Sequence, residues 1–166
     1  MPAPLFVVLG GEVRGNMLSD LDDLIAAAKQ ELAETEPVEQ EVLLGGKIVT
    51  VRVSPVDGTT WEGITSKCPP RAGANRDMQL GYSLPDVVQA YRAIVLVDGD
   101  EIDDMVRTDE DGKSESRWPA VYAALSAPDR KNVELVVWGL NEYDHVQKML
   151  AAGKASKGSA SKKKQR

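Results

Sequence analysis

The sequence predicts an α+β domain in which a small antiparallel sheet packs against several amphipathic helices. Three observations carry this prediction. Gly45-Gly46 separates two runs in which apolar residues alternate with polar ones, the pattern of a β-hairpin. Apolar residues recur at helical spacing in several other segments. The chain has 166 residues, of which 42% are hydrophobic, a size typical of one domain with short appendages.

The first expected helix begins after Ser19, which forms a capping-box pattern with Asp22. Pro37 marks its end. Its apolar stripe consists of Leu21, Leu24, Ile25, Ala28 and Leu32. The hairpin around Gly45-Gly46 follows. A second helix is expected from Thr59, which Glu62 completes as a capping pair, and this helix has to end before Pro69-Pro70.

The second half of the chain alternates short elements with polar turns. Residues 69–81 lack periodicity and predict a loop, after which Ser83 and Asp86 begin a short helix. A buried strand is expected at 93–97, with a return strand or turn through Ile102 and Val106. Residues 108–116 predict a polar loop. Two helices then follow, one from Trp118 and one capped by Ser126 with Pro128 in its first turn, and the helical pattern continues to Gly153.

Charge divides the chain into regions of opposite sign. Six of the 20 basic residues lie in 153–166, a segment without acids, which leaves 14 basic against 26 acidic residues before it, a net charge of −12. Residues 153–166 have no large apolar side chain and predict a disordered basic tail. The expected organisation is therefore an apolar arm at 1–17, an α+β domain at 18–152 and the tail. An acidic body disfavours nucleic acid as a partner.

Composition restricts the chemistry. The only cysteine is Cys68, which excludes a disulfide framework and a cysteine zinc site. The only histidine is His145, which disfavours a histidine-based catalytic triad. The acids from Asp98 to Asp104 miss the spacing of a calcium loop, because Ile102 stands at a ligand position. We expect no catalytic residue, metal or cofactor. With neither a membrane span nor a basic leader, the chain is expected in the cytoplasm.

Several short motifs follow one another in the middle of the chain. They are Trp61-Glu62-Gly63-Ile64 and Pro69-Pro70-Arg71, followed by Asp77 and Gly81-Tyr82. The acidic helix and the Gly45-Gly46 hairpin precede them, and Trp118, Trp138 and Asn141 follow them. This order resembles that of the tail assembly chaperones of long-tailed phages and prophages of actinobacteria, over roughly residues 18–142. The chain departs from the pattern at Cys68 and in a long acidic, hairpin-like insertion at 98–116.

The resemblance implies a non-enzymatic assembly factor. Such proteins bind the tape measure protein in the host cytoplasm before the tail tube polymerises, and they are absent from the finished virion. The family also implies a longer form of the protein made by programmed frameshifting, for which the codons of Gly153-Lys154 and Lys162-Lys163-Lys164 are candidate slippery sites. We expect the partner-binding residues to be Trp61, Pro69, Pro70, Arg71 and Trp118.

Two rival functions stay open on the sequence alone. A structural virion protein, such as a tail tube or head–tail connector subunit, would also use hairpins and an extended arm. A regulator could bind nucleic acid through the basic tail. Homo-oligomers are expected to form by strand addition through the apolar arm, whose residues are Leu5, Phe6, Val7, Val8 and Leu9.

Overall fold

The computed structural model describes residues 20–163, with side chains up to residue 154. The chain divides into two units after Thr35. In the first unit, residues 20–34 form the helix that the periodicity predicts. The apolar stripe of this helix stays exposed, with Leu24 at 66% of its full accessibility. The predicted Ser19 cap, the apolar arm at 1–17 and its self-association residues 5–9 lie outside the described residues.

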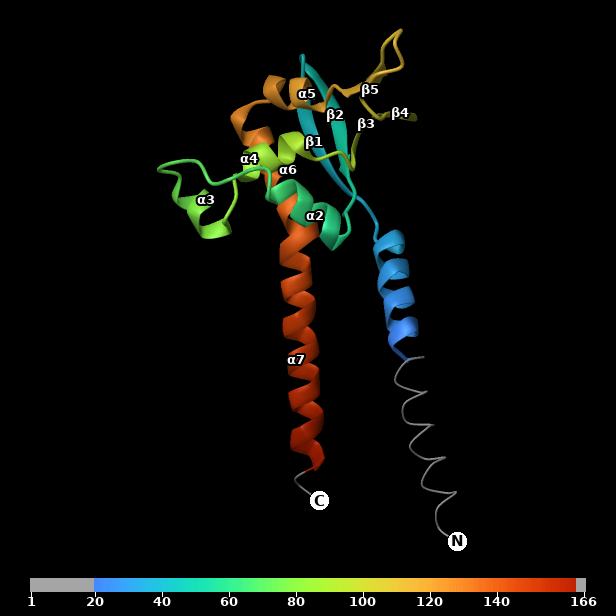
Figure 1. Cartoon of the computed structure of the whole chain (residues 1–166), viewed down its shortest axis with the longest axis vertical. Coiled ribbons are helices and arrows are strands. Elements are labelled where there is room, and N and C mark those ends of the chain that lie inside the picture. Colours follow the sequence, from blue (N-terminus) through green and yellow to red (C-terminus); the bar gives the residue numbers. More distant parts are fainter. Residues whose placement is uncertain (1–19, 164–166) are drawn as a thin grey trace. The chain divides into compact units, whose positions relative to one another are not determined.

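A four-stranded antiparallel sheet of order β1-β2-β3-β4 organises the second unit (Figure 1). Its strands are β1 (Val38–Leu44), β2 (Lys47–Val53), β3 (Ile94–Asp98) and β4 (Glu101–Asp103). The predicted hairpin is confirmed, since Leu44 pairs with Lys47 across the two glycines. Gly45 and Gly46 have φ angles of 59° and 80°, which side chains with a Cβ disfavour.

The segment expected as a polar loop contributes instead to a second hairpin. Strands β5 (Val106–Thr108) and β6 (Ser114–Ser116) pair with each other. The hydroxyls of Thr108 and Ser114 lie 3.0 Å apart across this pair. The Asp109 carboxylate accepts two backbone N–H groups within the connecting turn. The loop prediction was wrong because polar side chains hold these three-residue strands together where an apolar alternation is absent.

Helices account for most of the remaining chain. They are α2 (Gly58–Thr65), α3 (Asn75–Leu80), α4 (Leu84–Ala90), α5 (Trp118–Ala124), α6 (Ala127–Trp138) and α7 (Asp144–Lys163), with a π-helical turn η1 (Gly139–Tyr143) between the last two. Ser126 caps α6 as predicted, by accepting the N–H of Asp129. The cap of α2 is Asp57 rather than Thr59, because its carboxylate accepts the N–H of Thr60 at 2.8 Å.

One further segment differs from the sequence prediction. The expected loop at 69–81 contains the short helix α3, which ends at Gly81 with a φ of 83°. Helix α7 extends to Lys163 and so includes the first part of the basic segment that begins at Gly153. A helix that is already nucleated gains one hydrogen bond for each residue it adds, and this favours its extension into a segment with little packing of its own.

The core lies between the inner face of the sheet and helices α4, α5 and α6. Helix α6 packs on β1 and β2, while α4 contacts both α5 and α6. The fully buried side chains include Val51 and Val53 of the sheet, Tyr91 after α4, Trp118 of α5 and Val137 of α6. This arrangement confirms the predicted α+β class. Figure 1 shows α6, η1 and α7 following one another as one helical column.

Candidate functional site

Glu142, in the π-helical turn, is the hub of a polar network that joins three parts of the second unit. Its Oε1 accepts hydrogen bonds from the indole N–H of Trp61 at 3.0 Å and from the hydroxyl of Tyr82 at 2.7 Å. Its Oε2 accepts the indole N–H of Trp138 at 3.2 Å. The pKa of Tyr82 is raised by burial and by its bond to this carboxylate. One carboxylate therefore holds α2, the segment before α4 and the end of α6.

The neighbouring residue Asn141 extends the same network. Its side-chain oxygen accepts the backbone N–H of Val56 at 3.1 Å, and its amide donates to the hydroxyl of Tyr91 at 3.0 Å. The Tyr91 hydroxyl in turn donates to the carbonyl oxygen of Ser54. Burial raises the pKa of Tyr91 to about 12. The turn η1 thus fixes the start of α7 to the sheet and to α2.

Trp61, a predicted partner-binding residue, lies half-buried within this network. Its ring meets those of Tyr82 and Tyr91 edge-on, with centroids 5.9 and 6.3 Å away. Edge-to-face contacts of this kind stabilise aromatic clusters. Because Trp61 is half-buried and its N–H already donates to Glu142, only the part of its side chain that remains exposed is available to a partner.

Trp118, another predicted contact residue, has no exposed surface at all. Its indole N–H donates to the carbonyl oxygen of Val88 at 2.7 Å, and its ring lies 6.0 Å from that of Tyr122. The structure buries the Trp118 side chain in the core, which leaves it no exposed surface for the predicted partner contact. A tryptophan on a helical stripe suits a core and an interface equally well, so the sequence pattern could not separate the two roles.

The predicted Pro69-Pro70-Arg71 loop is held from within by an ion pair. The Arg71 guanidinium donates to both carboxylate oxygens of Asp77, at 2.7 and 3.0 Å, and the Arg71 backbone N–H donates to the same group at 3.0 Å. Pro69 is exposed and Pro70 half-exposed. Arg71 is itself about half-exposed, whereas Asp77 is almost fully buried. The ion pair therefore fixes the conformation of this exposed loop.

This ion pair predicts a specific acid sensitivity. The hydrogen bonds from Arg71 lower the pKa of Asp77 to about 2. A depressed pKa stabilises the fold above the unfolded value of about 4, and this contribution is lost as the pH falls from about 4 towards 2. In Arg71→Ala, we expect the Asp77 pKa to rise towards its ordinary value and the acid-dependent loss to shrink. An NMR titration of the Asp77 carboxyl, with unfolding curves at several pH values, measures both.

The exposed Arg107 supplies the control for that titration, because Arg107→Ala removes the same charge without touching Asp77. An Asp77 pKa that stayed near 2 in Arg71→Ala would contradict the assignment of the ion pair as its cause.

A second buried carboxylate, Glu134, is also engaged internally. It accepts the Tyr122 hydroxyl at 2.6 Å and lies 3.5 Å from the guanidinium of Arg76. Burial and this hydrogen bond raise the pKa of Tyr122. Cys68 is buried as a free thiol, and burial raises its pKa, as expected of a structural cysteine. His145 lies exposed on α7.

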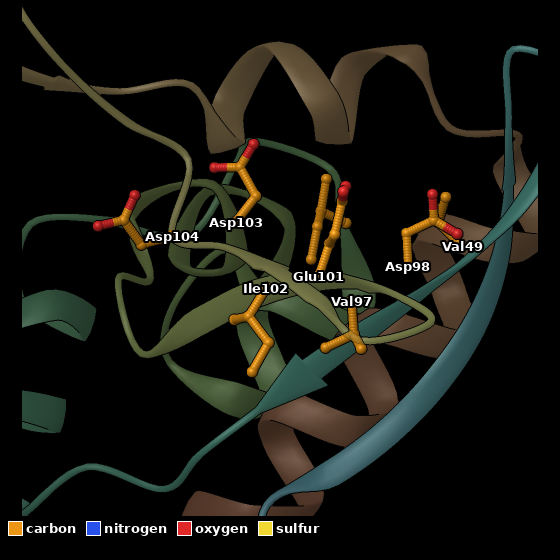
Figure 2. Close-up of a pocket in the computed structure, with 8 residues that line it drawn as sticks. Val49, Val97, Asp98, Glu101, Ile102, Asp103 and Asp104 are labelled. Atoms are coloured by element: carbon orange, nitrogen blue, oxygen red, sulfur yellow. The ribbon is translucent and has the colours of Figure 1, made fainter.

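The acidic turn after β3 lines a shallow cleft of about 740 Å³ (Figure 2). Two of its carboxylates bond to the backbone of the same segment: Asp103 accepts the N–H of Met105 at 2.7 Å, and Asp104 accepts the N–H of Val106 at 3.0 Å. A third, Asp98, forms an ion pair with Lys47 of β2. Figure 2 shows the acidic side chains spread along the hairpin. Among the residues whose placement is described, no group of three potential ligands could hold a metal ion.

An apolar stripe begins at Tyr143, the last residue of η1, and continues along α7. Its side chains recur at positions i, i+3, i+6 and i+7 and retain about half or more of their accessibility: Tyr143 47%, Val146 50%, Met149 63% and Leu150 53%. We call these four residues the α7 stripe. The Tyr143 ring also contacts that of Trp138, with centroids 5.3 Å apart. A soluble domain ordinarily turns such a stripe inward. Apolar cross-strand neighbours are also exposed on the outer face of the hairpin, at Leu43 and Ile48.

Comparisons with models of known protein families, with curated proteins and with solved structures found no match. Within residues 20–163, no helix combines the length and the apolarity that a membrane crossing requires.

The second unit therefore contains two distinct features, the internal hydrogen-bond network around Glu142 and the exposed α7 stripe. Of the residues that the sequence singled out, Trp61, Tyr82, Trp138 and Asn141 belong to the network around Glu142. The Pro69-Pro70-Arg71 loop lies at the surface, and Trp118 lies in the core. Sequence reasoning missed Glu142 and the exposure of the α7 stripe. A signal for Glu142 was present in its spacing of four residues from Trp138, which places both on one helical face. Its other donors are 60 and 81 residues distant in sequence, so only the fold could reveal them.

Proposed function

We propose that this chain is a phage tail assembly chaperone that binds the tape measure protein through the α7 stripe. The observation that carries the proposal is the exposure of Tyr143, Val146, Met149 and Leu150 on one face of a helix. A tape measure protein is long and helical, and before assembly its apolar helical faces are open to solvent. An amphipathic helix is a suitable partner for such a face, because side chains at i, i+3 and i+7 fill the groove of a second helix.

The scaffold supports this role by holding the start of α7 rigidly. Glu142 and Asn141 tie the turn before α7 to α2, to the segment between β2 and α2 and to the segment after α4. A helix anchored at one end presents its stripe with less conformational entropy to lose on binding. The acidic body, with its net charge of −12 before residue 153, would keep a chaperone–client complex soluble.

The proposal places binding in the host cytoplasm and removes the protein before the virion is complete. Mass spectrometry of purified particles tests this part directly. Abundant peptides from this chain would favour the alternative function, that of a structural tail or connector subunit. The longer frameshifted form is a separate proposal that the nucleotide sequence around Lys154 and Lys162 can test.

The decisive experiment is co-expression with the tape measure protein, followed by affinity capture. We expect the double variant Val146→Asp, Leu150→Asp to capture the client roughly tenfold less well or worse, because two buried apolar contacts become two desolvated carboxylates. Circular dichroism and unfolding midpoints should change little, since both side chains are exposed in the free chain.

The matched control is Gln147→Asp, Ala151→Asp. These positions have the same spacing and receive the same charges, but they lie about 100° further round the helix. Equal capture by the two double variants, or undiminished capture by the stripe variant, would contradict the proposed use of this face.

A further inference from the structure

The helix of the first unit carries a stripe that matches the one on α7. Leu21, Leu24 and Ile25 keep 52%, 66% and 46% of their accessibility, and the half-buried Leu32 continues the same face about two turns after Ile25. The chain therefore contains two amphipathic helices whose apolar faces are exposed within their own units. The apolar face of either helix is therefore a candidate packing surface for the apolar face of the other.

Charge makes the two helices complementary. Residues 20–34 hold five acidic residues and one lysine, a net charge of −4. Residues 144–163 hold five lysines and one aspartate, a net charge of +4, with His145 taken as neutral. Neither helix would pair well with itself, because like charges would be brought together along the contact. Pairing one with the other removes both apolar stripes from water and neutralises both charges.

The distribution of charge along each helix selects an antiparallel pairing. The acids of the first helix concentrate at its start, at Asp20, Asp22 and Asp23, whereas the lysines of α7 concentrate in its second half from Lys154 onward. If the two helices run in opposite directions, the acidic start lies beside Lys154, and Leu32 lies beside Tyr143. The two helix dipoles are then also opposed, which is the favourable sense.

We propose that helix 20–34 of one copy packs antiparallel on the α7 stripe of a second copy, and that the contact is made twice in a symmetric dimer. Every copy supplies one acidic and one basic helix, so a two-fold arrangement covers all four stripes at once. The inference uses the same α7 face as the proposed function but requires no client. A client helix would have to displace the partner's helix 20–34, so the free dimer keeps the stripe covered until assembly begins.

The purified full-length chain tests this without any client. Light scattering coupled to size exclusion is expected to give the mass of a dimer. We expect Leu24→Asp, which places a carboxylate in the stripe, to weaken dimerisation by roughly tenfold or more, whereas Ala26→Asp on the opposite face leaves it unchanged. Raising the salt concentration should weaken the wild-type dimer, since part of the attraction is between exposed charges.

A mixing experiment establishes that the contact is between copies. Leu24→Asp has a defective acidic helix and an intact α7, while Val146→Asp, Leu150→Asp has the reverse. Each alone should be a monomer, and their mixture should form a heterodimer through the one remaining intact contact. A wild-type chain that is monomeric at every concentration tested, or a dimer that persists in both variants, would overturn the proposal. Loss of client capture with an intact dimer would overturn only the proposed function.

Discussion

Replacement of Glu142 by alanine is expected to lower the free energy of unfolding by about 3 kcal/mol, because three hydrogen-bond donors lose their acceptor at once. The indole groups of Trp61 and Trp138 and the hydroxyl of Tyr82 would be left in a half-buried site that admits little water. Urea unfolding followed by tryptophan fluorescence measures the loss, and two of the three donors report on it directly.

Two further variants test whether the loss of stability is specific to the Glu142 carboxylate. Glu142→Gln keeps one acceptor oxygen of similar shape and should cost less than the alanine variant. Glu62→Ala removes an exposed glutamate from α2 and should stay within about 0.5 kcal/mol of wild type. If Glu142→Ala and Glu62→Ala were equally stable, the network around Glu142 would contribute nothing to the fold.

The same variant bears on function through the position of α7. Because Glu142 and Asn141 anchor the turn that precedes the stripe, Glu142→Ala should also loosen the presentation of the stripe in the molecules that remain folded. Client capture is then expected to fall although no stripe residue has changed. Unaltered capture by the folded fraction would show that the anchor serves stability alone.

Trp118→Ala is expected to cost about 3–5 kcal/mol of unfolding free energy, the range observed when a large buried aromatic side chain is removed. The whole side chain is inaccessible to solvent, and its N–H loses the carbonyl oxygen of Val88. A domain of this size has only about 5–15 kcal/mol in total, so much of the chain could be unfolded at 37 °C. A thermal melt followed by circular dichroism measures the effect.

Trp118→Phe decides between the core role and the contact role that the sequence suggested. Phenylalanine keeps most of the ring volume but lacks the N–H donor, so we expect a moderate loss of stability and normal client capture. A variant with wild-type stability and impaired capture would instead mark Trp118 as a contact residue and contradict its assignment to the core.

The elements that could be predicted from the sequence are those whose causes lie within a few residues. The Gly45-Gly46 turn, the Ser126 cap and the stripe of residues 20–34 each depend on local backbone preferences or on the helical period. The elements that were missed depend on particular side-chain contacts. Helix α3 has little apolar pattern, and the β5–β6 hairpin is held by polar groups that ordinarily indicate a loop.

The sequence by itself determined the class of the fold, the Gly45-Gly46 hairpin, most of the helices and the opposite charges of the body and of residues 153–166. Only the tertiary structure decided which aromatic residues are buried and which helical face remains open. Trp118 and the α7 stripe have similar apolar patterns, yet Trp118 is fully buried and bonds to Val88 of α4, whereas the stripe residues keep 47% to 63% of their accessibility. Periodicity tells which side chains share a face, whereas burial depends on what packs against that face from distant parts of the chain.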